Sequence, residues 1–206
     1  MKNIRLTVWI GIMCGWLAAG MLQAGTRPDN ARPAEEDGSR LWLPVMRPVE
    51  GAEVEVIYKG KVSPTIAVAI AELKNAWKGE PVLLEKKRTG QGDGFAITSS
   101  EHQVRILSST EAGLLYGVYS LLRMQAVGQV TVPLSVTEQS VYDLRILNHW
   151  DNPDGTVERG YAGCSLWNWE ELPGTLSPRY EAYARANASV GINGTVLNNV
   201  NASPQV

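Results

Sequence analysis

The hydrophobic pattern along the chain becomes regular near residue 53. Polar and apolar residues alternate over 53–58, which is typical of a half-buried strand. Short apolar runs at 81–84, 94–98 and 103–107 predict three further strands, of which the last two should pair. Residues 130–136 predict one more extended stretch. Together these runs predict a small sheet.

A helical period replaces the alternation over 63–78. Ser63 is suited to the N-cap, Pro64 to the first turn, and Gly79 follows the last periodic residue. The apolar side chains of this segment fall on one face, namely Ile66, Ala69, Ile70, Leu73 and Trp77. We therefore expect a helix that buries this face.

A second helix is predicted over 108–123, where Ser and Thr residues and an acidic first turn precede periodic apolar positions. Gly113 and Gly117 lie four residues apart and hence on one face of that helix. We expect them to let the helix backbone approach the sheet closely. Residues 39–139 are thus predicted to form a small α+β domain.

The pattern changes at Asp143. Residues 144–147 predict a strand, a long Gly- and Pro-containing loop follows, Ser177 caps a helix to about 190, and 195–197 predict another strand. A strand–helix–strand order of this kind makes the two strands parallel. It is typical of a (β/α)₈ barrel, which takes about 250 residues. Since 63 residues follow Asp143, we expect 140–206 to be the incomplete start of a barrel.

The first 24 residues predict an export signal. Lys2 and Arg5 precede an uncharged, mostly apolar run over 6–22, and small residues allow cleavage after Ala24. An uncleaved membrane anchor is the alternative, because the run is nearly long enough to span a bilayer. Cleavage would place the protein in the periplasm or the medium, with no membrane attachment, and 25–38 would be a polar linker.

Composition narrows the function classes. The net charge of −2 and the lack of a basic stripe give no reason to expect nucleic acid as a partner. Seven Trp and seven Tyr against one Phe favour surfaces that join apolar ring faces to polar groups, as sugar sites do, although core packing is the alternative. Without Cys14 in the signal, Cys164 has no disulfide partner, and we predict that it is buried. His102 and His149 have no metal-ligand spacing.

The candidate chemistry lies where the two late strands end. Amide clusters at 148–152 and 198–201 follow these strands, and a parallel barrel builds its site at that edge. Trp150 could stack on a sugar face, His149 could donate to a hydroxyl, and Asp151 could accept from one. The alternative is that these side chains satisfy the loop backbone.

The long loop adds a second candidate pair. Glu158 could bind hydroxyls, and Arg159 could hold a substrate carboxylate in bidentate fashion. An internal ion pair that organises the loop is an equally good interpretation of Arg159.

Four motifs of the chain are specific, namely Leu-Asn-His-Trp-Asp-Asn (147–152), Glu-Arg-Gly-Tyr-Ala-Gly (158–163), Tyr-Ala-Arg-Ala-Asn-Ala-Ser (183–189) and the segment 191–202. Together they resemble the α-glucuronidases of xylan breakdown. The segment 36–43 is similar to the start of those enzymes. The helix motif 112–117 resembles the small hexosaminidase-like α+β domain that precedes their barrel and that of β-hexosaminidases.

The resemblance implies an inverting glycoside hydrolase without metal or organic cofactor. Its substrates would be glucuronoxylan-derived oligosaccharides, from which it removes α-1,2-linked (4-O-methyl)glucuronic acid, and the full-length family member could be a homodimer. Inversion needs an acid and a base carboxylate about 6.5–9.5 Å apart. The resemblance places both beyond residue 206, so no catalytic residue is assigned to this chain. The alternative is a truncated chain that acts only as a carbohydrate-binding or non-catalytic module.

The resemblance also supports a set of substrate-binding residues. Glu158 matches a family position that contacts the sugar, whereas Cys164 stands where a basic residue is expected and puts the local loop contacts in doubt. The predicted substrate-binding residues are Glu158, Trp150, Asp151, Arg159, Asn199 and Val200.

Overall fold

The computed structural model describes residues 43, 54–88, 90 and 92–197. Within these ranges, no helix combines the length and the apolar character that crossing a membrane requires. The predicted export signal and linker lie outside the described residues, and their assignment stays a prediction.

The described residues group into two compact units. One contains the residues up to Leu147 together with 178–194, and the other contains 148–177 and 195–197. The first unit holds the sheet and its helices.

A five-stranded mixed sheet forms the centre of the first unit. Its strand order is β1-β2-β4-β3-β5. β1, β2 and β4 run parallel, whereas β3 is antiparallel to both β4 and β5. The predicted pairing of 94–98 with 103–107 is confirmed. The extended stretch predicted at 130–136 is displaced, because its strand begins only after Leu134. The strands are β1 (Val56–Tyr58), β2 (Val82–Lys86), β3 (Phe95–Ser99), β4 (Val104–Ser108) and β5 (Ser135–Glu138).

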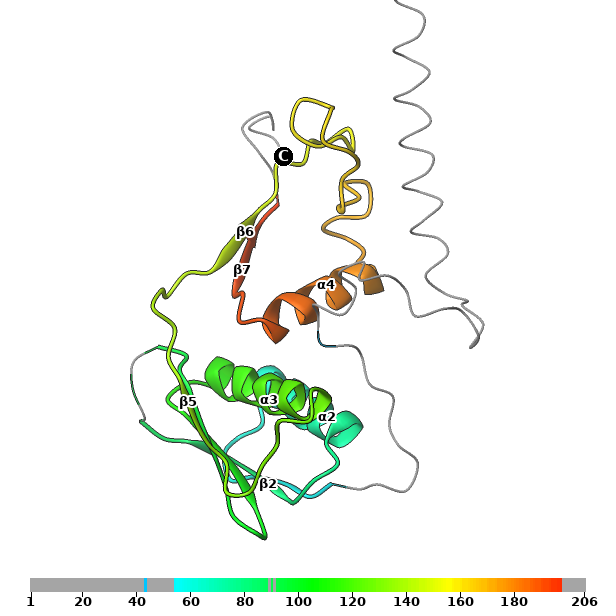
Figure 1. Ribbon diagram of the computed structural model, residues 1–206. Coiled ribbons are helices and arrows are strands. Elements are labelled where there is room, and N and C mark those ends of the chain that lie inside the picture. Colours follow the sequence, from blue (N-terminus) through cyan, green and yellow to red (C-terminus); the bar gives the residue numbers. More distant parts are fainter. Residues whose placement is uncertain (1–42, 44–53, 89, 91, 198–206) are drawn as a thin grey trace, which may run out of the picture. The chain divides into compact units, whose positions relative to one another are not determined.

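Two helices, α2 (Pro64–Ala76) and α3 (Glu111–Ala126), lie side by side on one face of this sheet (Figure 1). Each begins at a hydroxyl cap. Ser63 accepts from the Ile66 amide at 3.3 Å, and Thr110 accepts from the Gly113 amide at 3.0 Å. Side chains buried between the helices and the sheet include Ile66, Leu73, Val82, Leu84, Ile97, Ile106, Leu114, Val118 and Leu121.

The predicted close approach of the second helix is confirmed. A Cβ atom on Gly113 would lie against the Ser108 hydroxyl and 2.7 Å from the Asp93 carbonyl oxygen. One on Gly117 would lie 2.5 Å from a methyl carbon of Ile106. No real Cβ atom fits at these distances, so glycine at both positions sets how near α3 comes to the sheet.

After the sheet, the chain forms β6 (Ile146–Asn148), α4 (Pro178–Ser189) and β7 (Gly194–Val196). β6 and β7 form a two-stranded sheet. The Asn193 amide donates to the Arg145 carbonyl at 2.9 Å, and the His149 amide donates to the Val196 carbonyl at 3.0 Å. Residue numbers rise together along both strands, which confirms the predicted parallel pairing.

Arg145 joins three segments of the first unit. Its guanidinium lies 2.5 Å from the Asp93 carboxylate, and it donates to the carbonyls of Tyr142 and Gly191 at 2.7 and 2.5 Å. The same group lies 5.7 Å from the centre of the Tyr116 ring on α3. Arg145 and Asp93 are only 20% and 17% exposed, so little solvent screens the pair.

A second arginine attaches α4 to the helices of the sheet. Arg185 bonds both carboxylate oxygens of Glu72 on α2, at 2.5 and 2.8 Å, and donates to the Leu43 carbonyl at 2.7 Å. Tyr119 completes the group through a 3.3 Å bond to Glu72. Burial, reinforced by the nearby Glu72 carboxylate, raises the pKa of Tyr119. α4 therefore packs as part of the sheet unit.

Gly113→Ala should lower the free energy of unfolding by about 2 kcal/mol. Alanine gains about 1 kcal/mol of helix propensity, but the new methyl group overlaps Asp93 and Ser108. Urea denaturation measures the change. Ala71→Gly on exposed α2 surface calibrates the propensity, with an expected loss of about 1 kcal/mol. A Gly113→Ala protein more stable than the parent would contradict the close approach.

Arg145→Met should cost about 3 kcal/mol of stability, because it leaves the Asp93 carboxylate part-buried without its cation. The pair of changes Arg145→Met and Asp93→Leu should recover part of that loss. Arg179→Met, on the exposed surface of α4, is the matched control and should change stability by less than about 1 kcal/mol. Equal losses of stability in Arg145→Met and Arg179→Met would show that the bonds of Arg145 stabilise the fold no more than an exposed arginine does.

Candidate functional site

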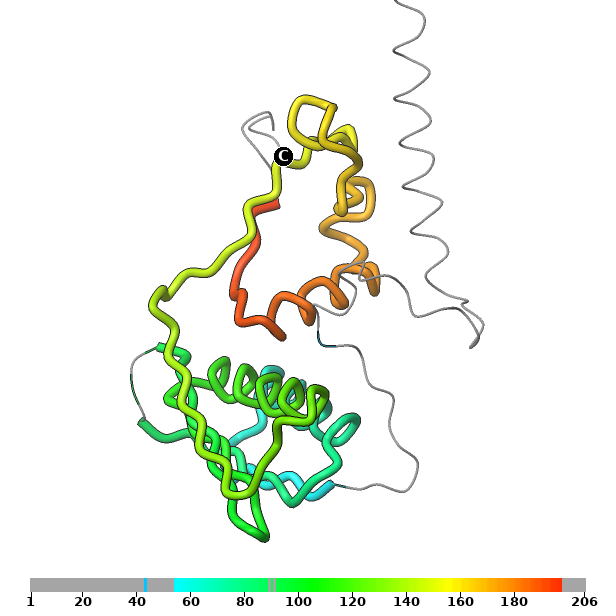
Figure 2. The backbone as a smooth tube through the Cα atoms, in the orientation of Figure 1, coloured from blue at the N-terminus to red at the C-terminus, as the bar shows by residue number. Residues whose placement is uncertain are grey.

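The candidate site lies in the long segment between β6 and α4. Figure 2 shows residues 149–177 winding without a helix or a regular strand. Isolated bridges pair Asp151 with Val157 and Thr156 with Cys164. The Ser165 amide also bonds the Gly155 carbonyl at 2.9 Å, so the first half of the segment folds back on itself.

Asp151 is the buried centre of this segment, with only 2% of its surface exposed. Its carboxylate accepts from the Ser165 hydroxyl at 2.5 Å and lies 3.5 Å from Nδ1 of His149. The His149 ring in turn meets the Trp167 ring edge-on, at 5.4 Å between centroids. The arrangement suits a carboxylate that orients His149. Direct sugar binding by Asp151 stays a prediction.

Asn152 is also buried and turned toward the loop backbone. Its side-chain amide donates to the Thr156 hydroxyl at 2.9 Å and to the Glu158 carbonyl at 2.6 Å. These two bonds agree with the alternative interpretation of the amide cluster, in which the Asn152 side chain satisfies polar groups of the loop.

Glu158 has the most constrained backbone in the segment. Its φ angle is 59°, and among the described residues it is the one non-glycine with positive φ. That conformation costs roughly 1–2 kcal/mol. It persists because the Glu158 amide bonds the Trp150 carbonyl at 2.6 Å and Asn152 holds the Glu158 carbonyl. A hydrogen bond to the Glu158 carboxylate raises the pKa of Tyr161.

The other predicted residues lie at the surface or outside the described chain. Trp150 is 51% exposed, and Arg159 is exposed and makes no ion pair with a described residue. The structure thus brings Trp150 and Glu158 together through their backbones. Asn199 and Val200 fall outside the described residues.

Two contributors to the segment were missed from the sequence. Tyr161 lay inside a quoted motif and could have been found there. Ser165 gave no usable signal, because its contact with Asp151 exists only once the loop closes.

The prediction that Cys164 is buried is wrong, since its side chain is exposed. Its backbone takes part in the bridge with Thr156, which places it at the rim of the folded loop rather than in a core. Among the described residues, no group of three or more His, Cys, Asp or Glu side chains could hold a metal ion.

Known proteins provide an independent comparison. Residues 124–206 match the glycosyl hydrolase family 67 middle domain. The chain is 41% identical over 112 residues to a probable alpha-glucuronidase A of Aspergillus clavatus and 44% identical over 112 residues to that of Neosartorya fischeri. It is 40% identical over 111 residues to alpha-glucuronidase A of Aspergillus tubingensis. The matched segments of the chain are therefore similar to the family 67 alpha-glucuronidases, which confirms the resemblance drawn from its motifs.

The likeness covers a limited share of each protein. It includes 54% of this chain and 13% of the length of each of these relatives. A solved GH138 enzyme targeting pectin rhamnogalacturonan II has a TM-score of 0.40 and 17% identity, over 48% of this chain and 17% of that one. A likeness this low carries no argument about fold or function.

Glu158→Gln should lower the pKa of Tyr161 toward that of an ordinary tyrosine, about 10. The phenolate is disfavoured while its hydroxyl donates to a carboxylate, and the neutral amide removes that negative charge. Carbon-13 NMR of the tyrosine rings measures the titration, with Tyr161→Phe assigning the signal. Glu170→Gln, exposed in the same segment, should leave the pKa unchanged. An equal pKa in the parent and Glu158→Gln would rule out the contact.

Proposed function

We propose that this chain is part of an α-glucuronidase that removes α-1,2-linked (4-O-methyl)glucuronic acid from xylooligosaccharides. The family 67 match and the names of its relatives support this class of activity. In this proposal β6, α4 and β7 are the first strand–helix–strand unit of a (β/α)₈ barrel, behind a hexosaminidase-like domain. The protein acts after export, in the periplasm or the medium.

The proposed role of this chain is to bind the sugar rather than to break the bond. Glu158 accepts from hydroxyls of the uronic acid, the exposed Trp150 face stacks on it, and Arg159 pairs with its carboxylate. Asn199 and Val200 are proposed to line the same site. Inversion needs an acid and a base carboxylate with a water between them, and we assign neither to this chain.

The observation that best supports this proposal is the strained Glu158. Backbone strain persists where surrounding contacts impose it, and it concentrates at functional sites. Here the contacts that impose it come from Trp150 and Asn152, in the motif that precedes the loop. Their combined effect is to fix the direction of the Glu158 side chain, as a binding carboxylate requires.

Carbohydrate binding without hydrolysis is the second candidate. The state of the carboxylates favours it. Asp151 is buried and engaged by Ser165, while Glu158 accepts a hydrogen bond from Tyr161. A carboxylate has about four lone-pair sites, so Glu158 can accept from a sugar hydroxyl as well as from Tyr161, whereas the buried Asp151 is out of reach of a substrate as an acid or base.

Glu158→Gln and Trp150→Ala should each weaken the affinity for aldotetraouronic acid about tenfold, because each removes one contact worth about 1.4 kcal/mol. Calorimetric titration measures the affinity, and Glu170→Gln is the control, expected to bind like the parent. The unmodified chain should release no 4-O-methylglucuronic acid from the same compound. Release would contradict the assignment and point to Asp151 or Glu158 as a catalytic group.

A further inference from the structure

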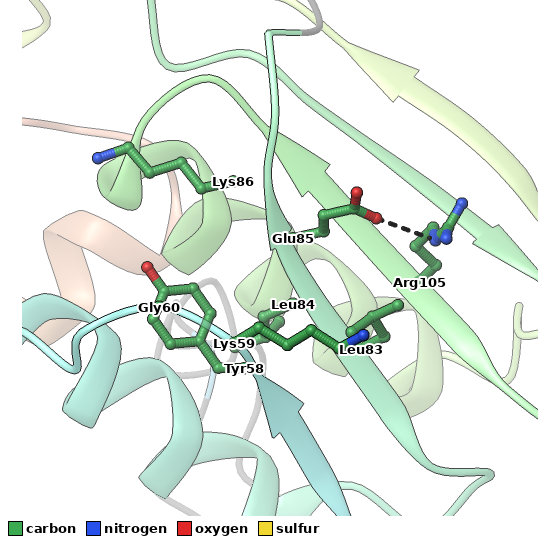
Figure 3. Close-up of a pocket in the computed structure, with 8 residues that line it drawn as sticks. All are labelled: Tyr58, Lys59, Gly60, Leu83, Leu84, Glu85, Lys86 and Arg105. Atoms are coloured by element: carbon green, nitrogen blue, oxygen red, sulfur yellow. Dashed lines mark ion pairs between the residues drawn. The ribbon is translucent and has the colours of Figure 1, made fainter.

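A pocket of about 400 Å³ lies at the C-terminal ends of β1 and β2, in the sheet unit (Figure 3). Its volume falls within the range of small-molecule sites. The residues that line it are Tyr58, Lys59, Gly60, Leu83, Leu84, Glu85, Lys86 and Arg105. None of them belongs to the loop discussed above.

Positive charge dominates this pocket, with three cations against one carboxylate. Lys86 pairs with Glu111 at 3.5 Å, and Figure 3 shows it pointing away from the other charges. Lys59 makes no ion pair with a described residue. The charge of Lys59 is therefore not compensated within the described part of the chain.

Arg105 is compensated only in part. Its Nε atom lies 3.4 Å from Glu85, a contact long enough to be weak, and the side chain is 49% exposed. Its two terminal guanidinium nitrogens bond no described residue. Those nitrogens form a planar fork that matches a carboxylate in bidentate geometry.

The remaining lining suits a sugar ring. Figure 3 shows the Lys59 side chain extending beside Leu83, which supplies an apolar floor between the charged groups. The Glu85 carboxylate and the Tyr58 hydroxyl can bond ligand hydroxyls. A ligand that matches the cations, the hydrogen-bonding groups and the apolar surface of this pocket carries a carboxylate, several hydroxyls and an apolar ring face.

We propose that this pocket is a second binding site for a uronic acid, held by Arg105 and Lys59 through the sugar carboxylate. The choice of a uronic acid attached to xylan rests on the proposed function. The pocket would retain the enzyme on glucuronate-bearing chains, and a neutral xylan chain would gain nothing from Arg105.

Calorimetric and NMR titration of the full chain with aldotetraouronic acid tests the proposal, with xylotetraose as the neutral comparison. The acidic sugar should shift the backbone amide signals of Leu83 and Glu85, and xylotetraose should not. Arg105→Gln and Lys59→Gln should each weaken the binding that causes those shifts about tenfold. Arg105→Lys keeps the charge without the fork and should recover only part of the affinity.

The controls separate this pocket from the loop. Lys74→Gln removes an exposed charge on α2 outside the pocket and should leave binding unchanged. Glu158→Gln should leave the Leu83 and Glu85 shifts intact. The proposed uronic acid site would be wrong if the acidic sugar shifted the Leu83 and Glu85 signals equally in the parent, Arg105→Gln and Lys59→Gln. It would also be wrong if the sugar caused no such shifts in the parent. Neither result would touch the proposed function, which Glu158→Gln and Trp150→Ala test at the loop.

Discussion

The first unit depends on the hydrogen bonds and the ion pair of the Arg145 guanidinium. This guanidinium is mostly buried, and a buried cation is tolerated only when its donors are matched. Asp93 supplies the opposite charge, and Tyr142 and Gly191 supply carbonyls from either side of the long insertion. Removing any one of these segments would leave the others with unmatched polar groups. This mutual dependence explains why α4 and the first two residues of β6 belong to the same compact unit as the sheet, although Asp93 and Gly191 lie 98 positions apart in sequence.

Local period and capping carried most of the fold prediction. Ser63 caps its own helix, so the sequence shows its effect directly. Gly113 and Gly117 approach Asp93 and Ile106, which lie further away in sequence, but their spacing of four residues marks one face of the helix. Arg185 and Glu72 are different, because they lie 113 positions apart and no periodic pattern links them. The strand after Leu134 was misplaced for a related reason. Its start is set by pairing with β3 rather than by its own apolar residues.

The motifs indicate candidate residues for the site but not the geometry of the segment that holds them. The motifs named Trp150 and Glu158, and the structure joins their backbones with a 2.6 Å hydrogen bond. What the sequence could not give is the surroundings of Asp151. Its carboxylate lies buried between Ser165 and His149, and its predicted contact with a sugar stays a prediction. A carboxylate reads the same in sequence whether it faces a ligand or a neighbouring hydroxyl, so only the closed loop distinguishes the two.

The arginines show how the same side chain separates into structural and binding roles. Arg145 and Arg185 are each 20% or less exposed. The guanidinium of each lies 2.5 Å from a carboxylate and donates to backbone carbonyl oxygen as well. All three guanidinium nitrogens of each of these two arginines therefore already bond protein groups. Arg105 is half exposed, and its one carboxylate partner lies 3.4 Å from Nε, which leaves the terminal fork open. Since an acidic sugar must replace water rather than a bound carboxylate, it is recognised most readily by an arginine of this second kind.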